Sequence, residues 1–175
     1  MTDKPLNILF LCTGNSARSI LAESILDGEG NGRFRAFSAG SHPKDAPHPL
    51  ALETLKAMGY RSEGFRSKSW DEFTAPGAPE VDFIITVCDS AAGEACPIMR
   101  GPGKRAHWGV EDPSHVEGTE EERRRAFTQT ATYLKSRIMA FINLHSTDSK
   151  PEDFDTQIKE IGVMEGATEK ARKAD

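Results

Sequence analysis

The first 26 residues constrain the fold most, because they follow the pattern of a buried strand, a loop of small residues and a helix. Residues 8–11 are apolar and lead into Cys12, and residues 20–26 have helical periodicity. Arg18 stands six residues after Cys12, at the point where the helix opens. We therefore predict a strand over residues 7–11, a helix over residues 18–26, and Cys12 at the end of the strand.

The loop between them has the composition of an anion cradle. Its small residues let the backbone wrap with N–H groups pointing inward, and these groups and the helix dipole favour negative charge. The same field is expected to stabilise the Cys12 thiolate, the reactive form of cysteine. Arg18 adds a planar two-pronged donor, and Ser19 can donate a hydrogen bond to the sulfur. The predicted oxyanion-binding residues are Thr13, Gly14, Asn15, Ser16, Ala17, Arg18 and Ser19.

Strand and helix patterns alternate through the next hundred residues. Strands are predicted over residues 33–38, 81–88 and 105–108, and helices over 49–58 and 119–144, with a short helix or turn at 67–73. Strands separated by helices indicate an α/β fold: one doubly wound domain with a four-stranded parallel sheet flanked by helices. We place this domain at residues 1–145. Residues 146–175 read as a charged C-terminal extension, either mobile or docked, that could contain one short helix. Phe154, Ile158, Ile161 and Met164 could form one apolar stripe there.

Composition limits the classes of function. The chain has 175 residues, a net charge of −5 and 37% hydrophobic residues, which is typical of one globular domain and argues against nucleic acid as the main partner. No apolar run approaches the ~18 residues needed to span a bilayer, and no signal-peptide core precedes the first strand. We expect a cytoplasmic protein. Three cysteines in a reducing compartment favour catalytic or redox use over a disulfide framework.

The other two cysteines stand near the end of the third predicted strand. Cys88 ends that strand, as Cys12 ends the first, so both thiols are expected on the same rim of the sheet. Cys96 follows after a connection of small residues that could move. Two thiols that approach each other can form a disulfide once one is oxidised. A structural interpretation stays open: Cys12 and Cys88 as buried strand residues, Arg18 as a surface residue and Cys96 as an incidental loop thiol.

A candidate acid follows the fourth predicted strand. Asp112 is placed to protonate a leaving oxygen over the cradle, and Pro113 stiffens its backbone. Glu111 is the competing choice, and a turn-forming Asp-Pro is the structural alternative. The histidines lack paired ligand spacing and no Cys-x-x-Cys is present, so we predict neither a metal centre nor a bound cofactor.

These segments together resemble the arsenate reductases built on the low-molecular-weight tyrosine phosphatase fold. The resemblance rests on residues 12–23, 37–40, 87–97 and 107–113, and spans about residues 7 to 145. The anion loop alone fits a phosphatase as well as a reductase. Cys88, Cys96 and the His-Trp-Gly segment at 107–109 favour the reductase, and Ser114-His115 stand where phosphatases of this fold usually carry tyrosines.

The resemblance implies a cysteine relay that reduces arsenate for detoxification. In such a relay Cys12 attacks arsenic held by the loop and Arg18, and Asp112 protonates the departing oxygen. Cys88 then attacks the Cys12 sulfur as arsenite leaves, and Cys96 attacks Cys88 to leave a Cys88–Cys96 disulfide. Phosphate would compete for the cradle. Some members also bind potassium near Asn15, Glu23 and Ser38.

The chain departs from this family pattern in two places. The Cys88–Cys96 spacing is one residue longer than in the best-known thioredoxin-coupled members, so thioredoxin and glutaredoxin with glutathione both stay open as the electron donor. The extension beyond residue 146 has no counterpart. Two other functions also stay open: a phosphatase that forms a Cys12 phosphocysteine, and a non-catalytic oxyanion or redox sensor.

Overall fold

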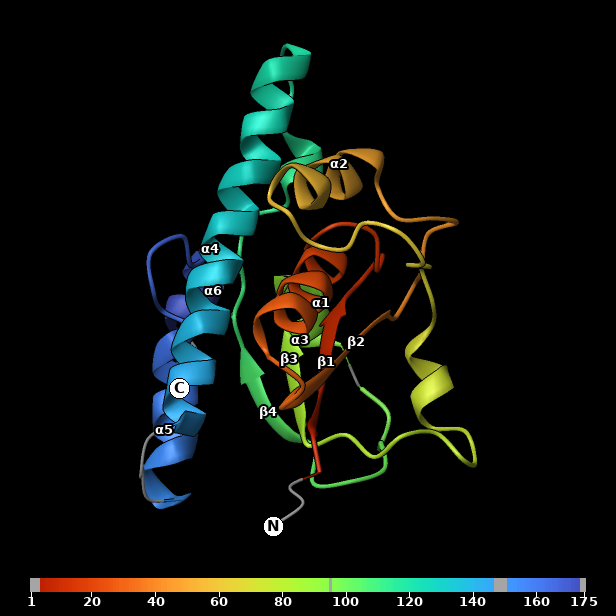
Figure 1. Cartoon of the computed structure of the whole chain (residues 1–175), viewed down its shortest axis with the longest axis vertical. Coiled ribbons are helices and arrows are strands. Elements are labelled where there is room, and N and C mark those ends of the chain that lie inside the picture. Colours follow the sequence, from red (N-terminus) through yellow and green to blue (C-terminus); the bar gives the residue numbers. More distant parts are fainter. Residues whose placement is uncertain (1–3, 95, 147–150, 174–175) are drawn as a thin grey trace.

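A four-stranded parallel sheet with the order β2-β1-β3-β4 forms the centre of the molecule (Figure 1). The computed structural model describes residues 4–94, 96–146 and 151–173. The strands are β1 (Leu6–Cys12), β2 (Phe34–Gly40), β3 (Phe83–Thr86) and β4 (Lys104–His107). The predicted α/β class and sheet are confirmed. Strand β3 is shorter than predicted, because the chain turns into a helix that begins directly after Cys88.

Helices flank the sheet, and several begin at recognisable caps. They are α1 (Arg18–Glu29), α2 (Pro49–Ala57), α3 (Asp89–Gly93), α4 (Glu120–Ser146), α5 (Pro151–Ile161) and α6 (Glu169–Lys173), with single turns η1 (Trp70–Phe73) and η2 (Pro113–His115). The His48 ring accepts the Leu50 N–H at the start of α2. The Thr119 hydroxyl accepts the Glu122 N–H at the start of α4. Such caps satisfy N–H groups that a helix leaves unpaired.

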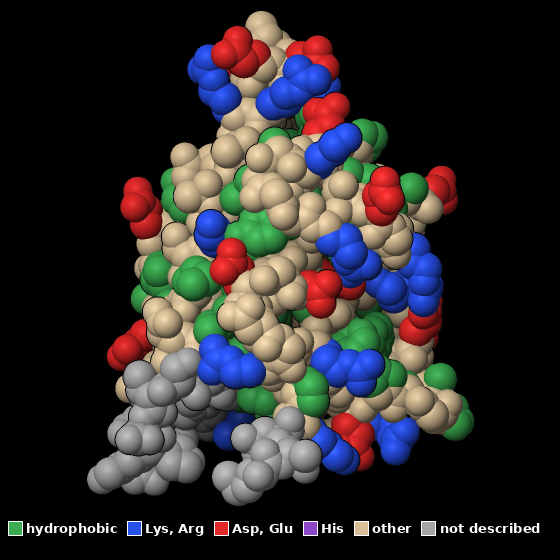
Figure 2. Space-filling model, in the orientation of Figure 1, with side chains coloured by type: hydrophobic (Ala, Val, Ile, Leu, Met, Phe, Trp, Pro, Cys, Tyr) green, Lys and Arg blue, Asp and Glu red, His purple; other side chains and the backbone are tan. Residues whose placement is uncertain are grey.

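The two faces of the sheet carry separate apolar cores. Alternate β1 residues point to opposite faces, so Ile8 and Phe10 pack with α1, α4 and α5, whereas Leu9 and Leu11 pack with Phe73 and a loop. The larger core is the one under the long helices. Charged side chains of both signs intermingle at the projecting end of the molecule (Figure 2). Within the ranges given above, no helix is long and apolar enough to cross a bilayer.

The C-terminal extension forms two helices rather than the single helix its sequence suggests, and its described part packs on the domain. Ile158 and Ile161 are buried in the larger core, and the Trp108 indole N–H donates to the Ile158 carbonyl at 3.1 Å. The fully buried Arg137 of α4 donates to the Glu165 and Met164 carbonyls. The Phe154 side chain, assigned to the same stripe, lies outside the described part.

Candidate functional site

The loop from Cys12 to Arg18 lies at the carboxyl end of β1 with its carbonyl groups turned outward. The Thr13, Gly14 and Ser16 carbonyls accept from the N–H groups of residues 42, 44 and 48, at 2.8 to 2.9 Å. The Asn15 carbonyl accepts from the Ser67 hydroxyl at 2.6 Å. Because the carbonyls are engaged outside the loop, we expect its N–H groups to face the pocket. This is the arrangement that binds an oxyanion.

Asn15 holds the loop in this shape through hydrogen bonds to buried residues. Its backbone has a φ of 46°, a left-handed conformation that asparagine tolerates. Its side-chain amide donates to the Ser19 hydroxyl at 2.8 Å and to the Ser38 hydroxyl at 2.9 Å. Asn15 and Ser19 are both fully buried. Of the predicted oxyanion-binding residues, these two therefore support the cradle rather than line it.

The Cys12 sulfur lies at the bottom of the pocket and is almost fully buried, with 4% of the residue exposed. The Ser19 hydroxyl lies 2.9 Å away, and the Asn15 N–H donates to the sulfur at 3.2 Å. Burial nevertheless raises the pKa of Cys12 above its ordinary value, and this outweighs the lowering by Ser19 and Arg18. Burial of the sulfur therefore opposes the stabilisation of a Cys12 thiolate by Ser19 and Arg18, since desolvation disfavours charge.

Arg18 and Asp112 meet above the cysteine. Their side chains approach to 3.4 Å, and Arg18 also donates to the Val110 carbonyl at 3.0 Å. Burial raises the pKa of Asp112, but hydrogen bonds from Ser114 and the charge of Arg18 together lower it by more. The net result is a pKa below the ordinary value of an aspartate. This net shift favours the carboxylate form of the candidate acid. Glu111, the competing choice, is exposed and does not line the pocket.

The pocket has a volume of about 270 Å³ and includes residues that the sequence patterns did not indicate. Lys44 lies over Gly14, close enough that a Cβ there would approach the lysine chain to 3.3 Å. The other additions are His42, Ser90 and His115. They come from three separate segments, namely the loop after β2, helix α3 and the turn η2, so no single local motif indicates them together. Lys44 adds positive charge for an anionic ligand.

The three thiols are free and unequally placed. Cys88 follows β3 on the same rim as Cys12, and its sulfur lies 3.6 Å from the Thr13 hydroxyl, beside the cradle. The Cys88 sulfur also accepts the Ala91 N–H at 3.3 Å and so caps α3. Cys96 instead packs with the smaller core on the opposite face of the sheet. Burial raises the pKa of the Cys96 thiol, and the nearby charge of Arg105 opposes that increase.

The place where relatives were expected to hold potassium contains a lysine ammonium. Ser38 donates to the Glu23 carboxylate and accepts from Asn15, so the three residues do meet. The Lys68 ammonium donates to the Ser38 carbonyl at 2.8 Å and to the Arg66 carbonyl at 3.2 Å, beside Glu23. The Lys68 ammonium therefore supplies a positive charge beside Glu23, and potassium binding here stays a prediction. In the part of the chain that is described, no cluster of three or more His, Cys, Asp or Glu side chains could hold a metal ion.

Fold and site together define an α/β protein with an oxyanion cradle, a cysteine beneath it and an arginine–aspartate pair above it. Residues 7–151 match the family described as low molecular weight phosphotyrosine protein phosphatase. The chain belongs to this family. The arsenate reductase of Oceanobacillus iheyensis is 36% identical over 138 residues, which cover 77% of this chain and 93% of that protein. That of Bacillus subtilis is 32% identical over 134 residues, with the same coverage.

Solved structures with the same fold include both activities found in the family. An arsenate reductase in a phosphate-binding state has a TM-score of 0.64 at 24% identity, over 79% of this chain and 97% of that one. A low molecular weight phosphotyrosine phosphatase from Vibrio cholerae has a TM-score of 0.66 at 23% identity, over 83% of this chain and 99% of that one. These similarities establish the fold; the activity has to be argued from the site.

Proposed function

We propose that this protein is an arsenate reductase that uses Cys12, Cys88 and Cys96 in sequence. The observation that carries the proposal is the position of the Cys88 sulfur, 3.6 Å from the hydroxyl of a cradle residue. A phosphatase needs one thiol, whereas electron transfer to arsenic needs a second thiol within reach of the first. The arsenate reductases among the relatives, at 32–36% identity, support the same function.

Substrate binding changes the charges around Asp112 and Cys12. An arsenate dianion that enters the cradle takes Arg18 away from Asp112 and brings negative charge toward that carboxylate. Both changes raise the pKa of Asp112, so that the carboxyl group can take up a proton and donate it to the leaving oxygen. The Cys12 proton can pass to an oxygen of the dianion, which leaves a thiolate next to arsenic.

The three thiols supply both electrons of the reaction, and Asp112 supplies one of the protons. The Cys12 sulfur bonds to arsenic, and one oxygen leaves as water with protons from Cys12 and Asp112. Cys88 attacks the Cys12 sulfur, the sulfur–arsenic bond breaks, and arsenic takes both electrons and leaves as arsenite. Cys96 attacks Cys88 and releases Cys12, so two thiols lose the two electrons that arsenic gains. A dithiol donor of the thioredoxin or glutaredoxin class then reduces the disulfide.

A single turnover without added reductant tests the proposal. Fully reduced protein is mixed with arsenate, and the arsenite formed and the thiols lost per chain are measured. We expect about one arsenite and two lost thiols, with the disulfide placed at Cys88–Cys96 by mass spectrometry. No arsenite with three intact thiols would reject the proposal, and hydrolysis of an aryl phosphate by the same sample would then favour the phosphatase.

The Cys88→Ser variant separates the two activities. It should lose multiple-turnover arsenate reduction, because no second thiol can release arsenite, and retain any aryl phosphate hydrolysis, which needs Cys12, Arg18 and Asp112 only. Arsenite formation and aryl phosphate hydrolysis are measured on the same sample. Cys12→Ser is the control that should lose both. Continued arsenate turnover by Cys88→Ser would exclude the three-thiol relay.

A further inference from the structure

Asp89, the first residue of α3, is held by three other residues. One of its carboxylate oxygens lies 2.7 Å from the Thr168 hydroxyl, which donates to it, and 2.9 Å from the His107 ring. The Asp89 carbonyl accepts from the Lys170 ammonium at 3.1 Å. Two of these contacts come from the C-terminal extension. We call the contacts of Thr168 and Lys170 with Asp89 the brace.

The segment that supplies the brace is itself bound to the domain. The Thr168 N–H donates to the Gly109 carbonyl at 3.0 Å, and Ala167 forms a β-bridge with Val110. The Thr168 hydroxyl also accepts the Ala171 N–H at 3.2 Å, so the group that binds Asp89 starts α6 as well. Val110 is the residue whose carbonyl accepts from Arg18. The extension therefore contacts the segment behind the anion cradle as well as α3.

The thiol relay requires α3 to change its position. Cys88 packs in the core on one face of the sheet and Cys96 packs on the other. A disulfide needs the two Cα atoms within about 4.4–6.8 Å and aligned Cβ atoms. The Cys88 sulfur now caps α3 by accepting the Ala91 N–H, and a bond to Cys96 would end that cap. Helix α3 has only five residues, so the whole helix is disrupted when it loses its cap and its first residue moves.

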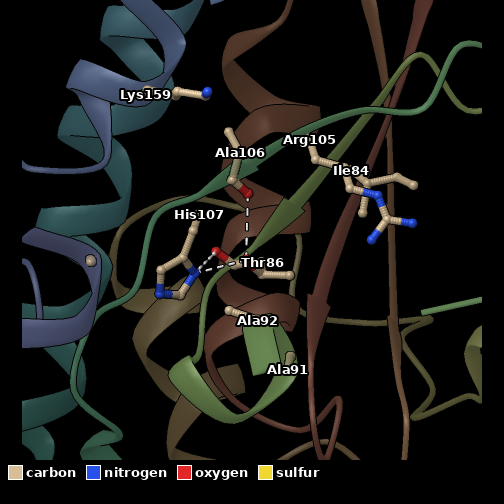
Figure 3. A pocket seen from close by; sticks show the side chains of 9 residues that line it. Ile84, Thr86, Ala91, Ala92, Arg105, Ala106, His107 and Lys159 are labelled. Atoms are coloured by element: carbon tan, nitrogen blue, oxygen red, sulfur yellow. Dashed lines mark hydrogen bonds between the residues drawn. The ribbon is translucent and has the colours of Figure 1, made fainter. Parts of the chain in front are cut away.

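A cavity of about 220 Å³ lies between α3 and the C-terminal extension (Figure 3). Ala91 and Ala92 of α3 line it on one side, and Lys159 of α5 and Ala171 of α6 line it on the other. Thr86 and His107, at the ends of β3 and β4, form its base, with 2.7 Å between the Thr86 hydroxyl and the His107 ring. The side chains of α3 that line the cavity are small, and residues of the extension line the cavity opposite them.

We propose that the C-terminal extension tunes the relay: the brace stabilises α3 in the reduced protein and opens when the Cys88–Cys96 disulfide forms. Thr168 and Lys170 are positioning residues that act on Cys88 through Asp89. This inference rests on the proposed function. Contacts made only in the reduced form favour that form, so they make the Cys88–Cys96 pair a stronger oxidant, which is easier for its donor to reduce.

The equilibrium of the disulfide with a redox buffer tests the brace. The whole chain is equilibrated with mixtures of reduced and oxidised dithiothreitol, quenched with acid, alkylated, and assayed by mass spectrometry for the Cys88–Cys96 bond. Thr168→Val removes the hydroxyl that donates to Asp89. It should shift the equilibrium about tenfold toward the disulfide, which for a two-electron couple is about 30 mV more negative.

Matched variants separate the brace from general damage to the fold. Thr168→Ser keeps the hydroxyl and should stay within about twofold of the wild-type equilibrium. Lys170→Gln should shift it in the same direction as Thr168→Val. Lys173→Gln, on the same helix but paired only with Glu169 among the contacts described, should not shift it. Wild-type equilibria in Thr168→Val and Lys170→Gln, with the disulfide forming normally, would overturn the brace and leave the proposed function intact.

Hydrogen exchange of the unmutated chain gives a second test. The Thr168, Ala171 and Arg172 N–H groups are hydrogen-bonded in the reduced protein. Oxidation should accelerate exchange in this segment at least about tenfold as the brace opens. Equal exchange in both redox forms would overturn the proposal. Failure of the disulfide to form with arsenate in the unmutated chain would instead reject the relay, and the brace with it.

Discussion

Two residues of the site show how the surroundings of a side chain shift a pKa that a sequence motif leaves open. Cys12 and Asp112 occur in the pattern of a nucleophile and an acid, which suggests a thiolate and a protonated carboxyl. The pKa of Cys12 is raised, first by burial, and that of Asp112 is lowered by Ser114 and Arg18 against the effect of burial. Both shifts run opposite to the direction that a nucleophile and an acid require. Under the proposed function, the negative charge of a bound oxyanion would have to oppose them.

The protonation of Cys12 can be measured from the pH dependence of its alkylation. In a Cys88→Ser/Cys96→Ser variant, only Cys12 reacts with iodoacetamide. Because its pKa is raised, the rate should climb about tenfold per pH unit from about pH 6 to about pH 8.5 without a plateau. The rate is followed by mass spectrometry. A plateau below about pH 7 would indicate a thiolate in the resting protein and contradict the burial argument.

Among the elements, the strand–loop–helix of β1 and α1 depends on its neighbour β2. Cys12 and Gly40 face each other at the ends of these strands. A Cβ on Gly40 would lie 2.4 Å from the Thr13 carbonyl oxygen and 3.0 Å from the Asn15 nitrogen. Both are backbone atoms that cannot rotate away. The shape of the cradle thus requires a glycine in a different strand.

Gly40→Ala should displace the cradle without removing any of its functional groups. We expect a loss of about 1–3 kcal/mol in the free energy of unfolding from overpacking, and about 100-fold weaker activity from the shifted loop. Urea unfolding and single-turnover arsenite formation measure the two effects. Arg35→Ala, at an exposed position of the same strand, is the control and should change neither. A fully active Gly40→Ala protein would show that the loop tolerates the displacement.

The sequence allowed prediction of those elements whose residues lie close together along the chain. Cys12, Arg18 and the flanking strand and helix form one local pattern, and the Asp112 position follows from parallel strands ending at one rim. The face on which Cys96 packs could not be predicted, because it follows a connection with no regular periodicity. Thr168 was missed for another reason: a single threonine in a charged segment gives no signal until folding brings it to Asp89.

For the whole molecule, the extension and α4 are joined through one buried guanidinium. Arg137 is fully buried and donates to three backbone carbonyls, those of Tyr133, Met164 and Glu165. Two of these carbonyls belong to the turn that leads into α6. Backbone carbonyls buried without partners are costly, so this side chain holds the extension in place.

Arg137→Met should therefore destabilise the docking of the extension by more than the smaller volume of the methionine side chain explains. The two carbonyls of the extension would lose their donor, and we expect a decrease of about 2–3 kcal/mol in the free energy of unfolding. Urea unfolding gives this value, and faster hydrogen exchange in residues 164–172 should accompany it. Gln129→Met, at an exposed position of the same helix, serves as the control. An Arg137→Met protein as stable as the wild type would contradict this assignment.

The direction of β1 has a practical consequence for anyone who labels this protein. The strand has seven residues and runs toward the cradle, so its first residue, Leu6, lies about 20 Å from Cys12 at ~3.3 Å per residue. Helix α6 ends at Lys173, only five positions after Thr168. An affinity tag or fluorescent fusion belongs ahead of β1. The same addition after α6 would pull directly on the residues that contact Asp89.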